Sequence, residues 1–248
     1  MPRANRYFVP GHLWHITHRC HQRDFHLKFT RDRRRWRYWL YEARKRYGLC
    51  VLNYIVTSNH IHLLVKDTTF GTISKSMQLI AGRTAQEYNK RKNRKGAFWE
   101  DRYHATAIET GRHLARCLVY IDLNMVRAGV VSHPLDWVNS GYREIQNPVE
   151  RYWVIDLAEL ANTFSCKNIS DFQQRHRQWV GDALSVEKHL RDARWSESLA
   201  IGSEGYIESI KAQLAIRSQY RHKKYERDAF VLKEEPKAYA VNLVEKAS

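Results

Sequence analysis

Two histidines separated by one isoleucine, His60 and His62, form the pattern in this sequence with the clearest chemical meaning. Alternate residues of a β-strand face the same side, so both imidazoles would project together while Ile61 faces the other side. Imidazole is the commonest side-chain metal ligand, and a bound divalent ion can polarise a phosphoryl oxygen as a Lewis acid. The pair therefore predicts half of a metal site. The alternative is a chance pair on a solvated strand face, in a chain with 13 histidines.

A second set of polar residues lies on segment 112–127, which has the spacing of an amphipathic helix. Tyr120 and Asn124 fall on one face, a helical turn apart and away from the apolar stripe. Tyrosine can attack phosphorus as a covalent nucleophile, but its ordinary pKa of about 10 means that it needs assistance. A metal ion held by His60, His62 and the Asn124 carbonyl oxygen would supply part of it. The alternative for Tyr120 is a half-buried aromatic of an amphipathic helix.

Composition and charge indicate a folded protein that binds a polyanion. The 248 residues are 43% hydrophobic and include eight tryptophans, enough for a substantial core. The formal net charge of +16 favours nucleic acid, although charge alone leaves DNA, RNA and an anionic membrane surface open. No apolar run approaches the roughly twenty residues that span a bilayer, and the N-terminus lacks the apolar core of a signal peptide. We therefore expect a cytoplasmic protein.

A cluster of potential metal ligands near the N-terminus has two interpretations. His15, His18, Cys20 and His21 lie close together in the sequence, but their spacing fits neither common structural-zinc pattern. The four cysteines are scattered and form no Cys-x-x-Cys pair, so a disulfide framework is not expected. The alternative to a zinc site is a strand whose polar side faces nucleic acid or solvent.

The hydrophobic patterns predict an α+β fold on an antiparallel sheet. We expect strands over residues 11–18, 50–56, 60–65 and 98–108, the second and third joined by a turn at 57–59. Helices are predicted over 32–47, ending before Gly48, over 72–90 with Thr72 as N-cap, and over 112–127. The basic loop 90–96 is either a phosphate contact or solvated surface. Six basic side chains are candidates for DNA binding: Lys75, Arg83, Arg94, Arg102, Arg116 and Arg127.

The C-terminal region is predicted to be basic and helical. A helix over 170–184 has a potential capping box at Ser170 and Gln173, and another helical stretch runs over 206–225. Its end interleaves basic and aromatic residues, which suits unpaired nucleotides, although a solvated helix end is the alternative. We therefore divide the chain into a catalytic domain, 1–149, and a DNA-binding extension, 150–248.

The two candidate groups lie in segments that resemble the single-tyrosine HUH transposases, most closely their REP-associated tyrosine transposase branch. Residues 58–64 hold the His-hydrophobic-His pair, and in residues 120–129 a polar residue follows the tyrosine by four positions. Further similar segments extend the resemblance over residues 7–146. Met125 stands where the family often has proline, and Thr57 where methionine is frequent. Neither change removes a chemical group from the mechanism.

The resemblance implies a ferredoxin-like antiparallel sheet with helices packed on it, a Mg²⁺ or Mn²⁺ ion, and cleavage of single-stranded or hairpin DNA. It assigns His60, His62 and Asn124 as metal ligands. Tyr120 becomes the nucleophile that forms a 5′-phosphotyrosine and frees a 3′-hydroxyl. We expect a monomer or homodimer.

Two other functions use the same features. A rolling-circle replication initiator or relaxase shares the chemistry, but often carries a helicase domain, and the sequence has no Gly-x-x-x-x-Gly-Lys loop. A domesticated DNA-binding regulator would keep the fold without turnover. The intact set of His60, His62, Tyr120 and Asn124 favours the transposase.

Overall fold

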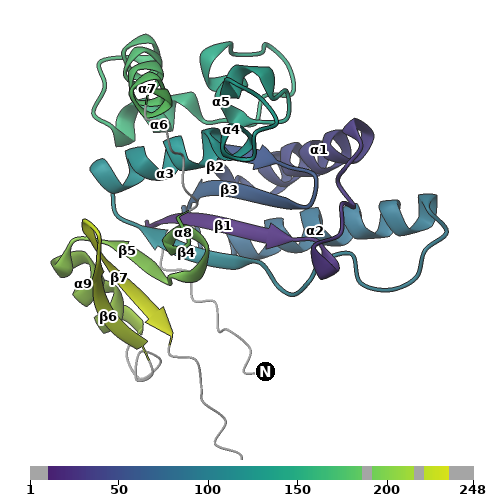
Figure 1. Cartoon of the computed structure of the whole chain (residues 1–248), viewed down its shortest axis with the longest axis horizontal. Helices are drawn as coiled ribbons and strands as arrows, with labels where there is room; N and C mark the ends of the chain where they lie inside the picture. The colour runs from purple at the N-terminus through teal and green to yellow at the C-terminus, as the bar shows by residue number, and fades with distance from the viewer. Residues whose placement is uncertain (1–10, 186–191, 215–220, 235–248) are drawn as a thin grey trace, which may run out of the picture.

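The computed structural model describes residues 11–185, 192–214 and 221–234, which form a seven-stranded sheet with helices on both faces (Figure 1). The strands are β1 (Leu13–Arg19), β2 (Cys50–Val56), β3 (His60–Lys66), β4 (His104–Ile108), β5 (Ala200–Gly202), β6 (Arg221–Glu226) and β7 (Ala229–Glu234). The helices are α1 (Thr30–Tyr47), α2 (Thr72–Arg91), α3 (Arg112–Asp122), α4 (Asn124–Arg127), α5 (Gly141–Gln146), α6 (Leu157–Thr163), α7 (Ile169–Leu184), α8 (Arg194–Glu197) and α9 (Glu204–Leu214), with short 3₁₀ helices η1 (His21–Arg23) and η2 (Pro134–Asp136). The predicted α+β fold class is confirmed.

The histidine pair lies on β3, between β2 and β1 in the strand order β2-β3-β1-β4-β5-β7-β6. All pairings are antiparallel except that of β4 with β5. The register places Thr17 of β1 opposite His62, and Arg19 opposite His60. Directly paired residues face the same side, so Thr17 and Arg19 share the face of the two histidines.

Different helices cover the two faces of the sheet. On one face, Trp36 of α1 lies against Tyr54 of β2, with ring centroids 6.4 Å apart, and α2 packs beside α1 (Figure 1). On the other face, the Asn53 amide donates a 2.9 Å hydrogen bond to Asp122 of α3. Asn53 pairs with Leu64, two residues from His62 and therefore on the same side. Helix α3 thus covers the histidine face.

The segment predicted as one helix over 112–127 is two helices in the structure. Helix α3 ends at Asp122, and α4 begins at Asn124, because Leu123 has a ψ angle of 5° that leaves the α-helical range. The Leu123 amide still donates to the Val119 carbonyl at 2.9 Å, so the chain bends without unwinding. Asn124 consequently remains next to Tyr120 despite the break.

The predicted helix boundaries were correct where a backbone signal was strong and wrong where only a side chain suggested a cap. Gly48 ends α1 in the left-handed conformation, with φ of 67°, as predicted. The N-cap of α2 is Gly71, and Thr72 is the first residue of the helix. The prediction of Thr72 as N-cap is therefore wrong. The N-cap of α7 is Asn168, whose side chain accepts from the Asp171 amide at 2.9 Å, rather than Ser170. Asx side chains lead among N-caps because they reach this amide well.

The strand predicted over 98–108 is shorter than expected. Regular pairing begins at His104, whereas Trp99 makes an isolated bridge with Cys20. The Trp99 indole turns away to donate to the Ala81 carbonyl of α2 at 3.1 Å. Aromatic residues suggested a strand here. In the structure, Trp99 instead packs between the end of β1 and α2.

The region after residue 149 contains helices, as predicted, and also three strands that the sequence did not reveal. Strand β5 pairs with β4, and the β6–β7 hairpin continues the sheet from β5. The prediction of helix over 206–225 holds for α9 up to Leu214, and residues 215–220 lie outside the described part. From Arg221 onward the chain is a strand, so that part of the prediction is wrong. Because β6 consists largely of charged residues, it lacks the alternation of apolar and polar residues that indicates a strand. Charged residues are common on edge strands.

A buried polar network joins α3 to α7, and its removal should cost stability. The Asp122 carboxylate accepts from His176 at 2.7 Å and from Asn53 at 2.9 Å, and both members of the Asp122–His176 pair are fully buried. We expect His176→Ala to lower the free energy of unfolding by about 3–5 kcal/mol, since it leaves the carboxylate short of a donor. Urea titration measures the difference.

The control for this prediction is the neighbouring Arg175, which pairs with Asp171 on the exposed side of α7. Arg175→Ala should change the unfolding free energy by less than about 1 kcal/mol, since exposed ion pairs contribute little. If both variants changed the unfolding free energy equally, the buried Asp122–His176 pair would contribute no more to stability than an exposed ion pair.

Candidate active site

His60, His62 and Asn124 meet at one point on the α3 face of the sheet. The Asn124 Nδ2 atom lies 3.0 Å from His62 Nε2 and 3.5 Å from His60 Nε2, and the two imidazole centroids are 5.0 Å apart. The first two side chains come from alternate positions of β3, and the third from the first residue of α4. The break after α3 thus places Asn124 directly over the histidine pair.

The protonation of His60 follows from its neighbours. Its Nδ1 atom is 2.7 Å from the Asn59 side-chain oxygen, whose amide group is oriented by donating to the Arg23 carbonyl at 3.1 Å. The Thr57 hydroxyl donates to the His60 carbonyl at 2.8 Å, which leaves its oxygen to accept. The Nδ1 atom of His60 therefore carries the proton. In the neutral ring, Nε2 then carries no proton, and this atom faces Asn124.

His62 is held neutral by its surroundings. Burial, followed by repulsion from His15 and His60, lowers its pKa well below the ordinary value. Its Nδ1 atom lies 2.9 Å from Nε2 of His15, whose own pKa burial lowers to about 3. Neutral imidazoles are the form that binds metals.

These donors fit a divalent metal ion. Two imidazole Nε2 atoms converge with the Asn124 carboxamide, whose amino group faces them and whose oxygen would take its place if the amide turned over. Among the described residues, no group of three or more His, Cys, Asp or Glu side chains could hold a metal, so a metal site here would need a ligand of another type. Asn124 is the candidate for that ligand, because its carboxamide lies at both imidazoles. Two imidazoles favour Mn²⁺ over Mg²⁺, which prefers oxygen ligands.

Tyr120 lies beside this point and is 9% exposed. Its ring centroid is 5.6 Å from that of His62, in an edge-on arrangement. The Arg127 guanidinium lies over the ring at 4.1 Å from its centroid, and donates to the Tyr120 carbonyl at 2.6 Å. Trp195 of α8 packs against the same ring, at 5.9 Å between centroids. Tyr120 is therefore held on several sides.

A cavity of about 600 Å³ opens onto these residues. His60, His62, Tyr120 and Asn124 all line it. Its basic lining consists of Arg19, Arg23, Arg102 and Arg127, and its acidic lining consists of Glu100, Asp101 and Glu197. The cavity is wide enough for part of a nucleotide chain and brings guanidinium groups, which suit phosphate, to the tyrosine.

The six predicted DNA-binding residues divide between the two faces. Arg102 and Arg127 line the cavity. Arg116 forms an ion pair with Asp228 and lines a neighbouring cavity of about 1050 Å³ that shares Tyr120. Arg94 is tied to its own loop, where it donates to the Ala97 carbonyl at 2.9 Å.

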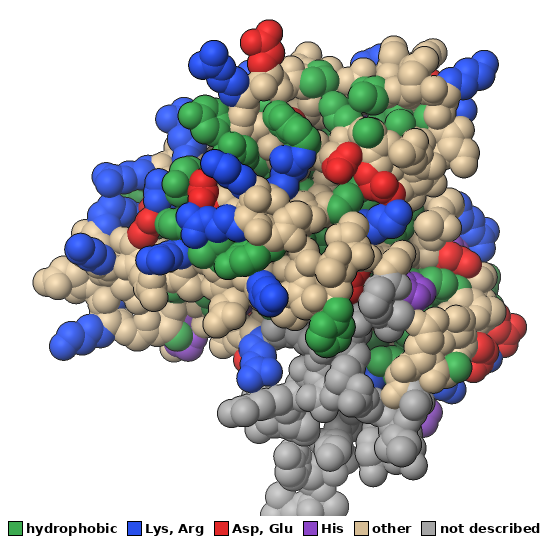
Figure 2. Space-filling model, turned by 180° about the vertical axis from the view of Figure 1, so that it is seen from behind, with side chains coloured by type: hydrophobic (Ala, Val, Ile, Leu, Met, Phe, Trp, Pro, Cys, Tyr) green, Lys and Arg blue, Asp and Glu red, His purple; other side chains and the backbone are tan. Residues whose placement is uncertain are grey.

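The remaining two predicted DNA-binding residues, Lys75 and Arg83, are exposed on α2, across the sheet from Tyr120. Lys and Arg side chains are spread over the side of α1 and α2 (Figure 2). The structure does not bring these two residues to the cavity.

The N-terminal ligand cluster does not assemble. His15 and His18 lie an odd number of residues apart on β1, and so face opposite sides of the sheet. His18 stacks on Trp99 with centroids 4.0 Å apart, whereas His15 contacts His62. The zinc interpretation is therefore wrong, and His15 belongs to the candidate active site.

Several residues of the site had no signal in the sequence. Arg19 ends β1 and reaches His60 through strand pairing, and Arg23 of η1 lies nearby because its carbonyl accepts from Asn59. Ser196 and Glu197 come from α8, a four-residue helix with no detectable periodicity. Such residues are recognisable only after the sheet has been assembled.

Comparison with known proteins gives one family match, which covers the first half of the chain. The family model described as IS200-like transposase matches residues 9–124 of the chain. This match begins just before β1 and ends at Asn124. Among the part of the chain that the structure describes, no helix is long and apolar enough to cross a membrane.

Two solved structures are similar to the chain. One is a REP-associated tyrosine transposase bound to a REP hairpin, with 19% identity, 63% of this chain and 94% of that chain covered, and a TM-score of 0.48. The other is described as a transposase from Deinococcus radiodurans R1, with 14% identity, coverage of 52% and 97%, and a TM-score of 0.35. No curated protein sequence matches significantly.

Proposed function

We propose that the protein is a metal-dependent transposase that cleaves and rejoins single-stranded or hairpin DNA through Tyr120. The observation that carries this proposal is the convergence of Tyr120, two imidazole Nε2 atoms and the Asn124 carboxamide in one arginine-lined cavity. His60, His62 and Asn124 would hold Mg²⁺ or Mn²⁺. The bound ion would make the phosphorus more electrophilic and stabilise charge on its oxygens.

The bonds that form and break in the reaction involve the side chain of Tyr120. The Tyr120 hydroxyl oxygen attacks phosphorus and loses its proton to water, while the bond to the 3′-oxygen breaks. The leaving 3′-oxygen takes up a proton and becomes a free hydroxyl. The 5′-phosphotyrosine keeps the energy of the broken bond, so another 3′-hydroxyl can attack it and restore both the DNA backbone and the tyrosine. Arg127 lies over the tyrosine ring and would hold a phosphate oxygen with the N–H groups that do not donate to the Tyr120 carbonyl.

The depth of the site favours unpaired DNA. Tyr120 is almost buried at the cavity wall, and a scissile phosphate must leave the surface of a duplex to reach it. A single strand or the unpaired flank of a hairpin bends into such a recess at low cost. We also propose that residues 150–248 form a DNA-binding extension, since Ser196 and Glu197 contribute to the cavity wall.

The test is a cleavage assay with hairpin DNA that carries single-stranded flanks and Mn²⁺. DNA labelled on the 3′ side of the cleavage point should remain attached to the protein after denaturation, and DNA labelled on the 5′ side should be released. Absence of an adduct together with tight binding would support the DNA-binding regulator. An adduct that forms on supercoiled plasmid and not on the short hairpin would favour the initiator or relaxase.

A further inference from the structure

His15 is a fully buried histidine that lies between the metal-ligand pair and the C-terminal region. On one side, its Nε2 atom is 2.9 Å from Nδ1 of His62, and the two rings stack with centroids 5.0 Å apart. On the other side, its Nδ1 atom is 2.9 Å from the backbone carbonyl of Trp195 in α8. Both ring nitrogens of His15 are therefore engaged, although neither contact could be read from the sequence.

The direction of these two hydrogen bonds is determined by the carbonyl. A carbonyl oxygen can only accept, so His15 Nδ1 must carry a proton and donate to Trp195. In neutral His15, Nε2 is then bare and must accept from Nδ1 of His62. Because the proton of neutral His62 is then on Nδ1, its Nε2 atom carries none. Nε2 is the atom that faces Asn124.

We propose that His15 is a positioning residue, which transmits the orientation of the Trp195 carbonyl to His62 and holds His62 in the tautomer that leaves Nε2 bare for metal. This inference rests on the proposed function, because it assigns His62 as a ligand. It makes the metal site dependent on a segment outside the family match, which ends at Asn124. A free imidazole favours neither nitrogen strongly, whereas metal-ligating histidines have the other nitrogen hydrogen-bonded.

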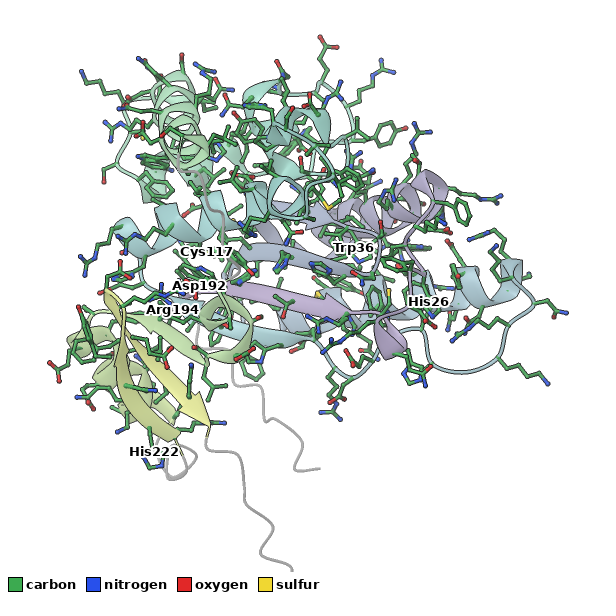
Figure 3. The ribbon with its side chains drawn as sticks, in the orientation of Figure 1. His26, Trp36, Cys117, Asp192, Arg194 and His222 are labelled. Carbon is green, nitrogen blue, oxygen red and sulfur yellow. The ribbon has the colours of Figure 1, made fainter. Side chains whose placement is uncertain are left out.

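The Trp195 carbonyl is a firm reference point because α8 is anchored on both sides. Towards the sheet, the Thr106 hydroxyl lies 2.6 Å from the Ser198 carbonyl, and His104 Nε2 lies 2.8 Å from the same oxygen. Away from the sheet, Arg194 donates to Asp192 at 2.7 Å and to the Glu226 carbonyl at 2.8 Å. Arg194, the first residue of α8, and Asp192 lie close together in Figure 3. The C-terminal region thus fixes the acceptor that orients His15.

A purely structural role for His15 makes different predictions. If the ring only filled space, a leucine of similar size would serve, and the state of His62 would not change. Glutamine distinguishes the two roles, because its amide oxygen can accept from His62 while its amino group donates to the Trp195 carbonyl. Rescue by glutamine and failure of leucine would follow only from the hydrogen-bonding role.

The experiment compares wild type, His15→Leu, His15→Gln and the control His26→Leu in the full chain. His26 is another buried histidine, and it packs against Tyr88 and Phe98 away from the site (Figure 3). Nitrogen-15 NMR of the metal-free protein reports which nitrogen of His62 is protonated, and calorimetry measures Mn²⁺ binding. We expect His15→Leu to lose the Nδ1-protonated state and to weaken Mn²⁺ binding about 10–100-fold. His15→Gln and His26→Leu should stay near wild type.

The outcomes separate the inference from the proposed function. An Nε2-protonated His62 in the wild type overturns the inference by itself, even if His15→Leu does not fold. Unchanged Mn²⁺ affinity in folded His15→Leu also overturns it. If the wild type binds Mn²⁺ with the expected tautomer but forms no DNA adduct, the proposed function fails while the role of His15 stands.

Discussion

Tyr120→Phe should abolish the covalent protein–DNA adduct while leaving the fold and DNA binding intact. The substitution removes only the hydroxyl oxygen, and the ring contacts with His62, Arg127 and Trp195 remain available. Loss of a covalent nucleophile lowers turnover by at least about 10³-fold in well-studied enzymes, and here no second nucleophile replaces it in the mechanism. The adduct is measured by denaturing electrophoresis with labelled hairpin DNA and Mn²⁺.

The matched control is Tyr38→Phe, since Tyr38 is an exposed tyrosine of α1 on the opposite face of the sheet. This variant should form as much adduct as wild type. An adduct of equal yield with Tyr120→Phe would exclude Tyr120 as the nucleophile, and mass spectrometry of the DNA-linked peptide would then identify the residue that acts.

His60→Ala is expected to reduce cleavage by at least about 10²-fold and to change DNA affinity by less than about threefold. Cleavage requires the metal site, in which His60 would supply one of two imidazoles, whereas binding of DNA is dominated by contacts with many phosphates. His60 is partly exposed at the start of β3, so its loss should disturb packing little. Fluorescence anisotropy gives the affinity and the labelled hairpin gives the cleavage rate. Chelation of divalent ions from the wild type should have the same effect.

His12→Ala provides the comparison, because His12 precedes β1 at the end of the β1–β3 pair that is distant from His60. The His12→Ala variant should cleave DNA and bind DNA as well as the wild type does. If His60→Ala lost binding and cleavage in equal measure, His60 would be a structural or DNA-contacting residue, and the metal site would lack a ligand.

The parts of the site that were predictable are those defined by short-range periodicity. The two-residue spacing of His60 and His62 follows from strand geometry, and the structure places both on β3. The four-residue spacing of Tyr120 and Asn124 follows from helix geometry, and both residues line one cavity although the predicted helix breaks at Leu123. That the two pairs meet depends on α3 crossing the histidine face, which the sequence indicated only through its resemblance to a family.

Residues that depend on long-range pairing could not be assigned in this way. Lys75 and Arg83 were candidates because they are basic and helical, but the sequence does not say which face of the sheet α2 covers. His15 was grouped with His18 by proximity, although strand alternation separates them. Strand β5 has only three residues and acquires its pairing from β4, about ninety positions earlier.

The parallel pairing of β5 with β4 has a consequence for solubility. Without the C-terminal strands, β4 would become an edge, and Ala107 and Ile108, now buried, would border an unpaired row of backbone groups. Exposed apolar edges recruit strands from other chains. We therefore expect residues 9–124 alone, the segment that the family model matches, to aggregate more readily than the full chain, because the later strands cover this edge.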